Sequence, residues 1–403
     1  DTDRSRGLGD VYKRQAPAPA DGAAPAGYHA TGMYPEYYKV DGVWRLAEKS
    51  RMDCVSVLAP DGELRIVEFR NLVQGDSVVL GRTDDGSEGI LMHTEGFSAG
   101  GKSAEAFAFR TGRSRETAFT RDYDALAGLL RHEKEHGNVV WVLGPACSFD
   151  ASAKAAMQAL IENGYAHGLL AGNALATHDL EGSLLHTALG QDIYTQESRP
   201  NGHYHHIDVI NAARAAGSIP AFIEQNGIRD GIMHACVAHG VPYVLAGSIR
   251  DDGPLPGVYG DVYAAQNAMR ELVQQATTVI CVATQLHTIA TGNMTPSYCV
   301  RGGRIRPVYL YCVDISEFVT NKLRDRGSLS SVPIVANAQD FLCRVAAGLG
   351  LPVAEKYDKI NPVLDVAFEM RHATSPHANV AQSVEQLIRN LVSYTHLTLP
   401  TIA

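Results

Sequence analysis

The sequence predicts an α/β protein, in which a doubly wound, mostly parallel Rossmann-like sheet follows a small β domain. Two patterns carry this prediction. From about residue 119 onward, short and almost wholly apolar runs alternate with helical stretches, which is typical of a parallel sheet covered on both faces. Before that point, short alternating runs are interrupted by Asp-Gly pairs, which indicate β-hairpins.

We therefore expect four segments along the chain. Residues 1–27 form a non-native or linker segment: residues 1–15 read as non-native, and residues 16–27 have the Ala/Pro/Gly composition of a linker. Residues 28–118 form the small β domain, and residues 119–350 form the α/β domain. Residues 351–403 are a C-terminal tail, the last part of which also reads as non-native.

Six apolar runs are the expected strands of the parallel sheet: 139–143, 168–171, 243–247, 278–283, 308–314 and 333–335. Ligands of open α/β sheets bind beyond the carboxyl ends of the strands, so the residues after each run are the candidates for a site. Five of these following segments are rich in Gly, Asn, Asp, Ser and Thr. We expect them to converge on one edge of the sheet.

Composition argues against several classes of protein. The 403 residues carry a formal net charge of −9, which gives no basic surface for nucleic acid. No apolar run approaches the roughly 18–20 residues that a membrane span needs. The seven cysteines are odd in number and have no paired spacing, which favours reduced thiols. We expect a cytoplasmic homo-oligomer with neither nucleic acid nor membrane as a partner.

Two of the candidate segments contain glycine at the end of a strand. Gly144 stands where a dinucleotide-binding fold keeps its glycine loop, although G-x-G-x-x-G is absent. It marks either a tight turn or a loop that lets a helix N-terminus approach a pyrophosphate. In "AGNALATHD", Gly172 would let the backbone approach a ligand that Asn173 bonds, while a helix N-cap is the simpler role for Asn173. Both roles can hold at once.

Charged residues follow two other strands. "SIRDDGPLPG" is either a salt-bridged surface turn or part of a site. In a site, Arg250 would bind a substrate carboxylate, and Asp251 or Asp252 would accept a proton or bind an amine. Asp314 either meets a ribose or a substrate ammonium, or caps the next helix. His287 either transfers protons near neutral pH or bonds to its own helix.

Two motifs point to other chemistry, and we weigh them lower. "NGHYHHID" holds His203, His205 and His206 without a cysteine partner or H-x-x-x-H spacing, so we expect no metal site. "GFSAGGKS" (96–103) matches the P-loop pattern of an NTPase, but no adequate helix follows it. A flexible Gly/Ser loop is the better interpretation, from which Lys102 could still reach a shared cleft.

Several long strings resemble the LOR/SDH-region family, among them "ALIENGYAHGLLAGNALATHDLEG", "VPYVLAGSIRDDGPLP" and "ATTVICVATQLHTIATGNMTPS". This is the group of archaeal-type ornithine cyclodeaminases and of the C-terminal part of the cyanobacterial arginine dihydrolase/ornithine cyclodeaminase. The resemblance covers nearly all of 28–350. It implies bound NAD and the conversion of L-ornithine to L-proline and ammonia by internal hydride transfer. It also implies a shortened N-terminal part and no arginine-hydrolysing domain, which puts arginine out of reach as a substrate.

Within that resemblance, the predicted catalytic residues are Arg250, Asp251, Asp252 and His287. The predicted NAD-binding residues are Gly144, Asn173, Ala174, Asp252, Ala283, Thr284, His287, Thr291, Gly292, Asn293 and Asp314. Substrate contacts from the β domain are expected at Lys102 or Arg115. Two other functions stay open: an NAD-dependent enzyme acting on a lysine- or saccharopine-like substrate, and a non-catalytic NAD-binding module.

Overall fold

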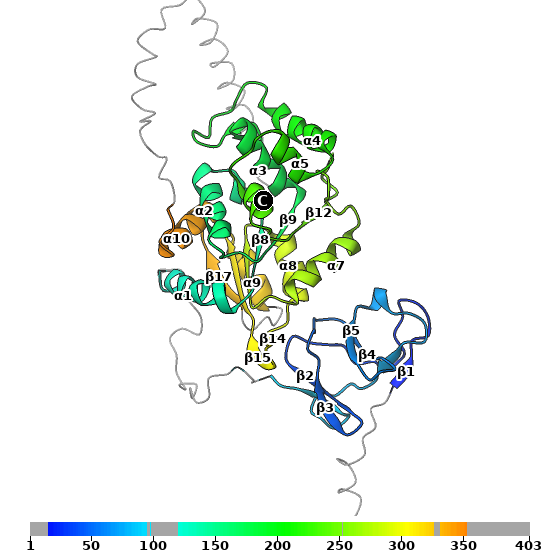
Figure 1. The fold of residues 1–403 in the computed structure, drawn as a ribbon. Helices are drawn as coiled ribbons and strands as arrows, with labels where there is room; N and C mark the ends of the chain where they lie inside the picture. Colours follow the sequence, from blue (N-terminus) through cyan, green and yellow to red (C-terminus); the bar gives the residue numbers. More distant parts are fainter. Residues whose placement is uncertain (1–14, 95–96, 98–119, 252, 326–330, 353–403) are drawn as a thin grey trace, which may run out of the picture. The chain divides into compact units, whose positions relative to one another are not determined.

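The structure, a computed structural model, describes residues 15–94, 97, 120–251, 253–325 and 331–352 (Figure 1). Several predicted features lie outside the described residues: Lys102, Arg115, Asp252, all of "GFSAGGKS" except Phe97, and the tail from residue 353.

Seven short strands form the small β domain. They are β1 (Gln15–Pro17), β2 (Glu36–Val40), β3 (Val43–Leu46), β4 (Val55–Leu58), β5 (Leu64–Val67), β6 (Ser77–Val79) and β7 (Ile90–Met92), with a 3₁₀ turn η1 (Phe69–Asn71). They pair in two antiparallel sheets, with strand orders β1-β6-β4-β5 and β3-β2-β7. Asp41 and Gly42 join β2 to β3 with φ of 51° and 78°, as the Asp-Gly signal predicts for a tight hairpin.

The prediction that residues 1–27 are a non-native or linker segment is corrected at residues 15–18. Gln15–Pro17 pairs with β6 as an edge strand, and Ala18 is only 2% exposed. Proline lacks a backbone N–H, so a proline-containing segment is tolerated at a sheet edge, where half of the hydrogen-bonding groups have no neighbour. The Ala/Pro composition was therefore compatible with both a linker and an edge strand.

The α/β domain is built on one six-stranded parallel sheet. Its strands are β8 (Val139–Leu143), β9 (Gly168–Gly172), β12 (Tyr243–Ala246), β13 (Thr278–Val282), β16 (Tyr309–Asp314) and β17 (Ser331–Val335). They lie in the order β12-β9-β8-β13-β16-β17. Numbered along the chain, this is the order 3-2-1-4-5-6 of a Rossmann fold, which confirms the predicted fold class.

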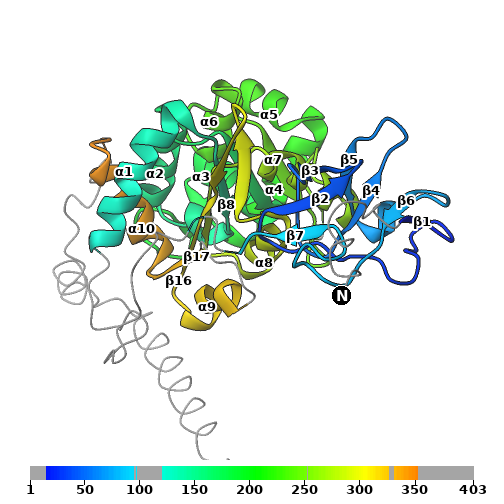
Figure 2. The ribbon, with the colours of Figure 1, turned by 90° about the horizontal axis from the view of Figure 1, so that it is seen from below.

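Helices cover both faces of this sheet. They are α1 (Thr120–His136), η2 (Pro145–Ser148), α2 (Ala151–Glu162), α3 (Asn173–Leu185), η3 (Gly202–Tyr204), α4 (His205–Ala216), α5 (Ile219–Gln225), α6 (Ile232–Ala238), α7 (Val262–Val273), α8 (Gln285–Met294), α9 (Glu317–Asp325) and α10 (Ala338–Gly348). Figures 1 and 2 show α1, α2 and α10 on one side of the sheet and α7 and α8 on the other.

The alternation of side chains along each strand divides the core into two layers. Trp141 and Leu143 of β8 pack into the cluster that contains α1, α2 and α10. The alternate residues Val140 and Val142 pack into the cluster that contains α7 and α9. Successive side chains of a strand point to opposite faces, so a strand that is apolar throughout must be buried on both.

Two insertions in the α/β domain were not predicted. Between β9 and β12 the chain adds a two-stranded pair, β10 (Thr187–Ala188) with β11 (Gln191–Asp192), and three helices, α4 to α6. Between α8 and β16 it adds a hairpin of β14 (Tyr298–Arg301) and β15 (Arg304–Pro307). Gly302 and Gly303 make its turn, with φ of 57° and 73°.

The β domain contacts the α/β domain through hydrogen bonds and one cluster of charges. Ser297 donates its hydroxyl to the Met33 carbonyl at 2.7 Å. Glu68, which is 5% exposed, has three arginines within 4 Å of its carboxylate oxygens. These are Arg51 at 2.9 Å, Arg70 at 3.9 Å and Arg270 of α7 at 2.6 Å. One buried carboxylate therefore balances cations from both domains.

All seven cysteines are free, and six of them are buried. Burial raises the pKa of the Cys147 thiol to about 12, which leaves it protonated at neutral pH. Among the helices of the described segments, none is long and apolar enough to cross a membrane.

Candidate active site

The order of the strands creates a crevice between β8 and β13. The chain leaves β8 toward β9 on one side of it, and returns through β13 toward β16 on the other. At such a switch point the connections diverge and leave room for a ligand beyond the carboxyl ends of the strands. Gly144 follows β8 here, and Ala283 and Thr284 follow β13. The structure thus brings three predicted residues together at the crevice.

Gly144 is required by the close approach of the two strand ends. Its N–H donates to the Val282 carbonyl at 2.9 Å. A Cβ atom at this position would lie 1.9 Å from the Ala283 carbonyl oxygen, well inside any real contact distance. Ala283 itself has φ of 52°, a left-handed conformation that a non-glycine residue adopts only at some cost in energy. Backbone atoms of Gly144 and Ala283 therefore meet at the bottom of the crevice, beside the Thr284 side chain.

Two helices present free N-termini to this edge. Neither α8, which has Thr284 as its N-cap, nor α3, which has Gly172, has a side chain that accepts from its first N–H groups. At α2 the situation differs, because the Asp150 carboxylate accepts from the Ala153 N–H at 2.9 Å. Free helix N-termini attract phosphate through their N–H groups and the helix dipole. The helix α2, which follows the glycine turn after β8, therefore has a capped N-terminus. The helix α8, which follows β13, has an uncapped one.

His287 lies over this edge from the first turn of α8. A Cβ atom on Gly172 would be 3.2 Å from the His287 Cε1 atom, so the ring reaches from beyond β13 to the end of β9. Burial lowers the pKa of His287, which keeps the imidazole neutral at pH 7. Its side chain makes no hydrogen bond or ion pair with any residue that the structure describes. The ring is thus not engaged with its own helix, the alternative that the sequence left open.

The loop after β12 is held in place from α3. The Asn173 side-chain oxygen accepts from the Leu255 N–H at 2.9 Å, and Asn173 is 6% exposed. Asp251 accepts from the Ser248 N–H at 2.8 Å and so stabilises the turn that carries Arg250. The Arg250 guanidinium is exposed and has no partner among the described residues. Asn173 therefore acts on the loop and does not cap α3, where Gly172 is the N-cap.

The other predicted residues are spread more widely. Ala174 lies in the first turn of α3, at the same edge. Asp314 ends β16, and one of its oxygens accepts from the Ser316 N–H at 2.8 Å, which closes the turn between β16 and α9.

Three more lie in the second half of α8: Thr291, Gly292 and Asn293. At a rise of about 1.5 Å per residue, Thr291 is about 10 Å along the axis from Thr284. A Cβ on Gly292 would meet Leu323 of α9 at 2.4 Å, which gives this glycine a packing role. The Asn293 carbonyl accepts from Met52 of the β domain at 3.2 Å. The structure does not bring these three to the crevice with Gly144.

Sequence reasoning missed a polar group on α3. His178 and Glu181 are both buried, and their side chains are 2.9 Å apart. Their spacing of three residues on a helix is compatible with a side-chain pair. However, α3 is buried almost all round, so its sequence shows no separate polar face that would mark them. Of the three histidines of "NGHYHHID", His205 joins this group through Thr187 at 2.7 Å. No group of three metal ligands was found among the described residues.

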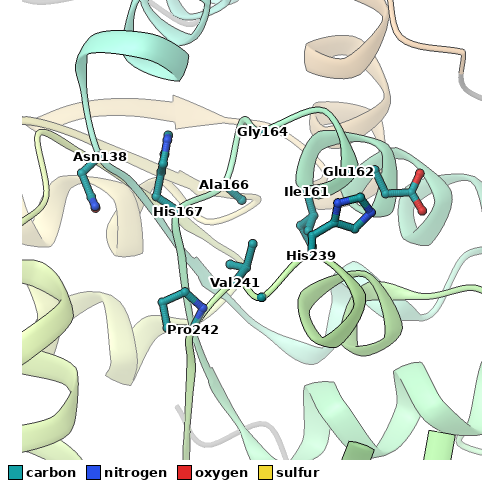
Figure 3. Close-up of a pocket in the computed structure, with 10 residues that line it drawn as sticks. Asn138, Ile161, Glu162, Gly164, Ala166, His167, His239, Val241 and Pro242 are labelled. Carbon is teal, nitrogen blue, oxygen red and sulfur yellow. The ribbon is translucent and has the colours of Figure 1, made fainter. Parts of the chain in front are cut away.

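A surface pocket of about 390 Å³ lies at the opposite edge of the sheet (Figure 3). Three of its residues, Asn138, His167 and Pro242, come directly before β8, β9 and β12. It therefore lies at the amino ends of the strands. Burial lowers the pKa of His167, whose Nδ1 accepts from the Val139 N–H at 3.0 Å. Because ligands of this fold bind at the carboxyl edge, we do not assign the site to this pocket.

The comparison with known proteins agrees with this geometry. The family "Arginine dihydrolase ArgZ-like, C-terminal, Rossmann fold" matches residues 125–345, more than half of the chain. The chain belongs to this ArgZ-like family. This confirms the resemblance seen in the sequence.

Relatives of this ArgZ-like chain include enzymes and solved structures. The ornithine cyclodeaminase of Methanopyrus kandleri is 38% identical over 330 residues, which cover 82% of this chain and 76% of that protein. The crystal structure of a LOR/SDH protein from Methanococcus maripaludis matches with a TM-score of 0.77 and 33% identity, over 84% of this chain and 98% of that one. The ternary complex of AgrE with ornithine and NAD⁺ matches with a TM-score of 0.54 and 32% identity, over 84% of this chain and 46% of that one.

Proposed function

We propose that this protein is an NAD-dependent ornithine cyclodeaminase, which converts L-ornithine to L-proline and ammonia. The observation that carries the proposal is the switch-point crevice, which has a backbone floor at Gly144 and a free helix N-terminus at α8. A related protein of this fold, AgrE, binds ornithine and NAD⁺ together. The archaeal relative from Methanopyrus kandleri is an ornithine cyclodeaminase.

The residues at the crevice fit a dinucleotide. Gly144 lets the ends of β8 and β13 meet without a side chain between them, and the first N–H groups of α8 and α3 can donate to phosphate oxygens. In the proposed reaction, bound NAD⁺ accepts the hydride from Cα of ornithine and returns it to the ring imine, so the overall reaction is redox-neutral. Neutral His287 lies at this edge and adds no positive charge that would repel an oxidised nicotinamide.

The loop after β12 would bind the amino acid. Arg250 offers an exposed guanidinium that can hold the ornithine carboxylate in a bidentate pair. Asp251 already uses one oxygen to hold the turn, so its part is to position Arg250. Asn173 fixes the far end of the same loop through Leu255. Asp252 stays a predicted proton acceptor.

The test is to incubate the protein with L-ornithine and NAD⁺ and to measure proline, ammonia and NADH together. The proposal expects proline and ammonia in equal amounts, with no NADH accumulating beyond the enzyme present. Accumulation of NADH without proline would instead indicate an amino-acid dehydrogenase. NAD⁺ binding without either product would indicate a binding module, and both results contradict the proposal.

A further inference from the structure

Three buried polar side chains, Glu181, His178 and Thr187, form a hydrogen-bonded chain that the half-buried His205 extends. Glu181 of α3 is fully buried, and its two oxygens accept from four donors. His178 Nδ1 donates at 2.9 Å and the Thr187 hydroxyl at 2.8 Å. The backbone N–H groups of Leu189 and Gly190 complete the set at 3.1 and 3.0 Å. A carboxylate with this many donors stays ionised although it is buried.

The hydrogen bonds determine where the protons lie. The Thr187 hydroxyl has one hydrogen, which it donates to Glu181, so it must accept from His205 Nδ1 at 2.7 Å. His178 likewise carries its hydrogen on Nδ1, because an ionised carboxylate only accepts. In the neutral ring, the Nε2 atom of His178 therefore has the free lone pair. A carboxylate that fixes a histidine in this tautomer also stabilises the ring when Nε2 takes up a proton.

His178 lies in the first half of α3, near the segment that follows the carboxyl end of β8. The ring of Phe149, which directly follows η2 beyond β8, has its centroid 5.5 Å from that of His178. His178 is five residues beyond Asn173, the first residue of α3, which is about 7.5 Å along the helix axis. The Nε2 atom of His178 has no hydrogen-bond partner among the described residues. It is also not among the fully buried polar atoms that lack a partner. His178 is 6% exposed, and its Nε2 atom keeps part of that exposed surface.

Few other titratable groups lie near His178. His206 of α4 has its ring centroid 6.0 Å away, and its Nδ1 is buried without a partner. On the other side of α3, Asp179 accepts from the N–H groups of Ile232 and Met233 and lies 3.9 Å from Lys154. That carboxylate holds α6 to α3 and has no bond to His178. Glu181 is therefore the counter-ion of His178.

We propose that His178, oriented by Glu181, is the acid–base residue that moves protons on the amino groups of the substrate. This rests on the function proposed above. The side-chain ammonium of ornithine loses a proton to Nε2 and becomes the nucleophile. The imidazolium then returns the proton to the departing α-nitrogen. The α-ammonium also gives a proton to solvent before the hydride leaves Cα, and the ring nitrogen gives one after it attacks. The released ammonia and the proline nitrogen take up protons from solvent, so that the singly positive ornithine cation gives neutral proline and ammonium.

The first experiment needs no turnover. Diethyl pyrocarbonate labelling, followed by peptide mass spectrometry, measures the reactivity of each histidine with and without NADH plus L-ornithine, a pair that cannot transfer hydride. Labelling of His178 should slow at least about fivefold with both ligands. Exposed His203, whose ring contacts only Tyr204, is the internal control and should keep its rate. An unchanged rate at His178 would overturn the proposal.

The second experiment measures catalysis. His178→Gln can still donate to Glu181, and we expect it to lower kcat by about 10²–10⁴-fold with NAD⁺ affinity unchanged. Glu181→Gln should lower kcat at least tenfold while KM stays within about twofold, as expected for a positioning residue. The matched control His203→Gln should keep wild-type kcat. A His178→Gln enzyme with more than a tenth of wild-type kcat would refute the acid–base role.

The two proposals fail in different ways. If the wild-type protein makes no proline, ornithine cyclodeamination is wrong, and the labelling experiment alone decides whether His178 faces the bound amino acid. If the wild type makes proline and His178→Gln does too, the function stands and the role of His178 is wrong.

Discussion

Replacing Gly144 with alanine tests the geometry of the crevice. The new Cβ atom would lie 1.9 Å from the Ala283 oxygen, and real Cβ contacts are not shorter than 3.0 Å. The two strand ends must therefore move apart by about 1 Å, which strains the 2.9 Å bond from the Gly144 N–H to Val282. Overpacking of this kind costs about 1–3 kcal/mol, and loss of the hydrogen bond costs about 1 kcal/mol more.

The assay combines urea unfolding with NAD⁺ titration by calorimetry. We expect Gly144→Ala to lower the free energy of unfolding by about 2–4 kcal/mol and to weaken NAD⁺ binding at least tenfold, which corresponds to about 1.4 kcal/mol. Gly128→Ala is the matched control, because Gly128 is an exposed residue of α1 with nothing within 4 Å of a Cβ atom. That change should stabilise by about 0.5–1 kcal/mol. Wild-type stability and NAD⁺ affinity in Gly144→Ala would refute the close approach.

Three further changes test other contacts. Asn173→Ala leaves the Leu255 N–H without its 2.9 Å acceptor; hydrogen exchange at that amide should speed up, and KM for ornithine should rise several-fold. Glu68→Gln removes the one carboxylate among three arginines and should cost about 3–5 kcal/mol in urea unfolding, with a smaller loss counting against the charge cluster. Burial alone raises the pKa of Glu181, but hydrogen bonds from His178, Gly190 and Thr187 outweigh it and bring the pKa below 4.5. Its stabilisation is therefore complete above about pH 4.5 and is lost as the pH falls through the folded pKa, so Glu181→Gln should flatten the acid side of a stability–pH curve.

The strands of the parallel sheet could be predicted because their signal is local. The run 139–143 is β8 to the residue, and the other five runs agree with their strands to within two residues at each end. A strand buried on both faces is apolar at every position, so its pattern is visible without knowledge of its neighbours. The carboxyl edge followed from that pattern: Gly144 after β8 meets Ala283 after β13, and Gly172 at the end of β9 lies beside His287.

The roles of single residues could not be predicted in the same way. Asn173 was expected to bind the cofactor, yet its side chain bonds to Leu255, 82 residues away. Thr291 to Asn293 were grouped with Thr284 because they are near in sequence, but α8 carries them away from the edge. His178 was passed over because its environment is made by Phe149, Thr187 and α4, which only the tertiary fold brings together.

Deuterium transfer from L-[2-²H]ornithine tests the central claim most directly. If the hydride leaves Cα and returns to the ring within one active site, the proline formed carries deuterium at Cα, and unlabelled NADH added to the mixture does not dilute it. Proline without deuterium, or deuterium that collects in free NADH, would contradict the account.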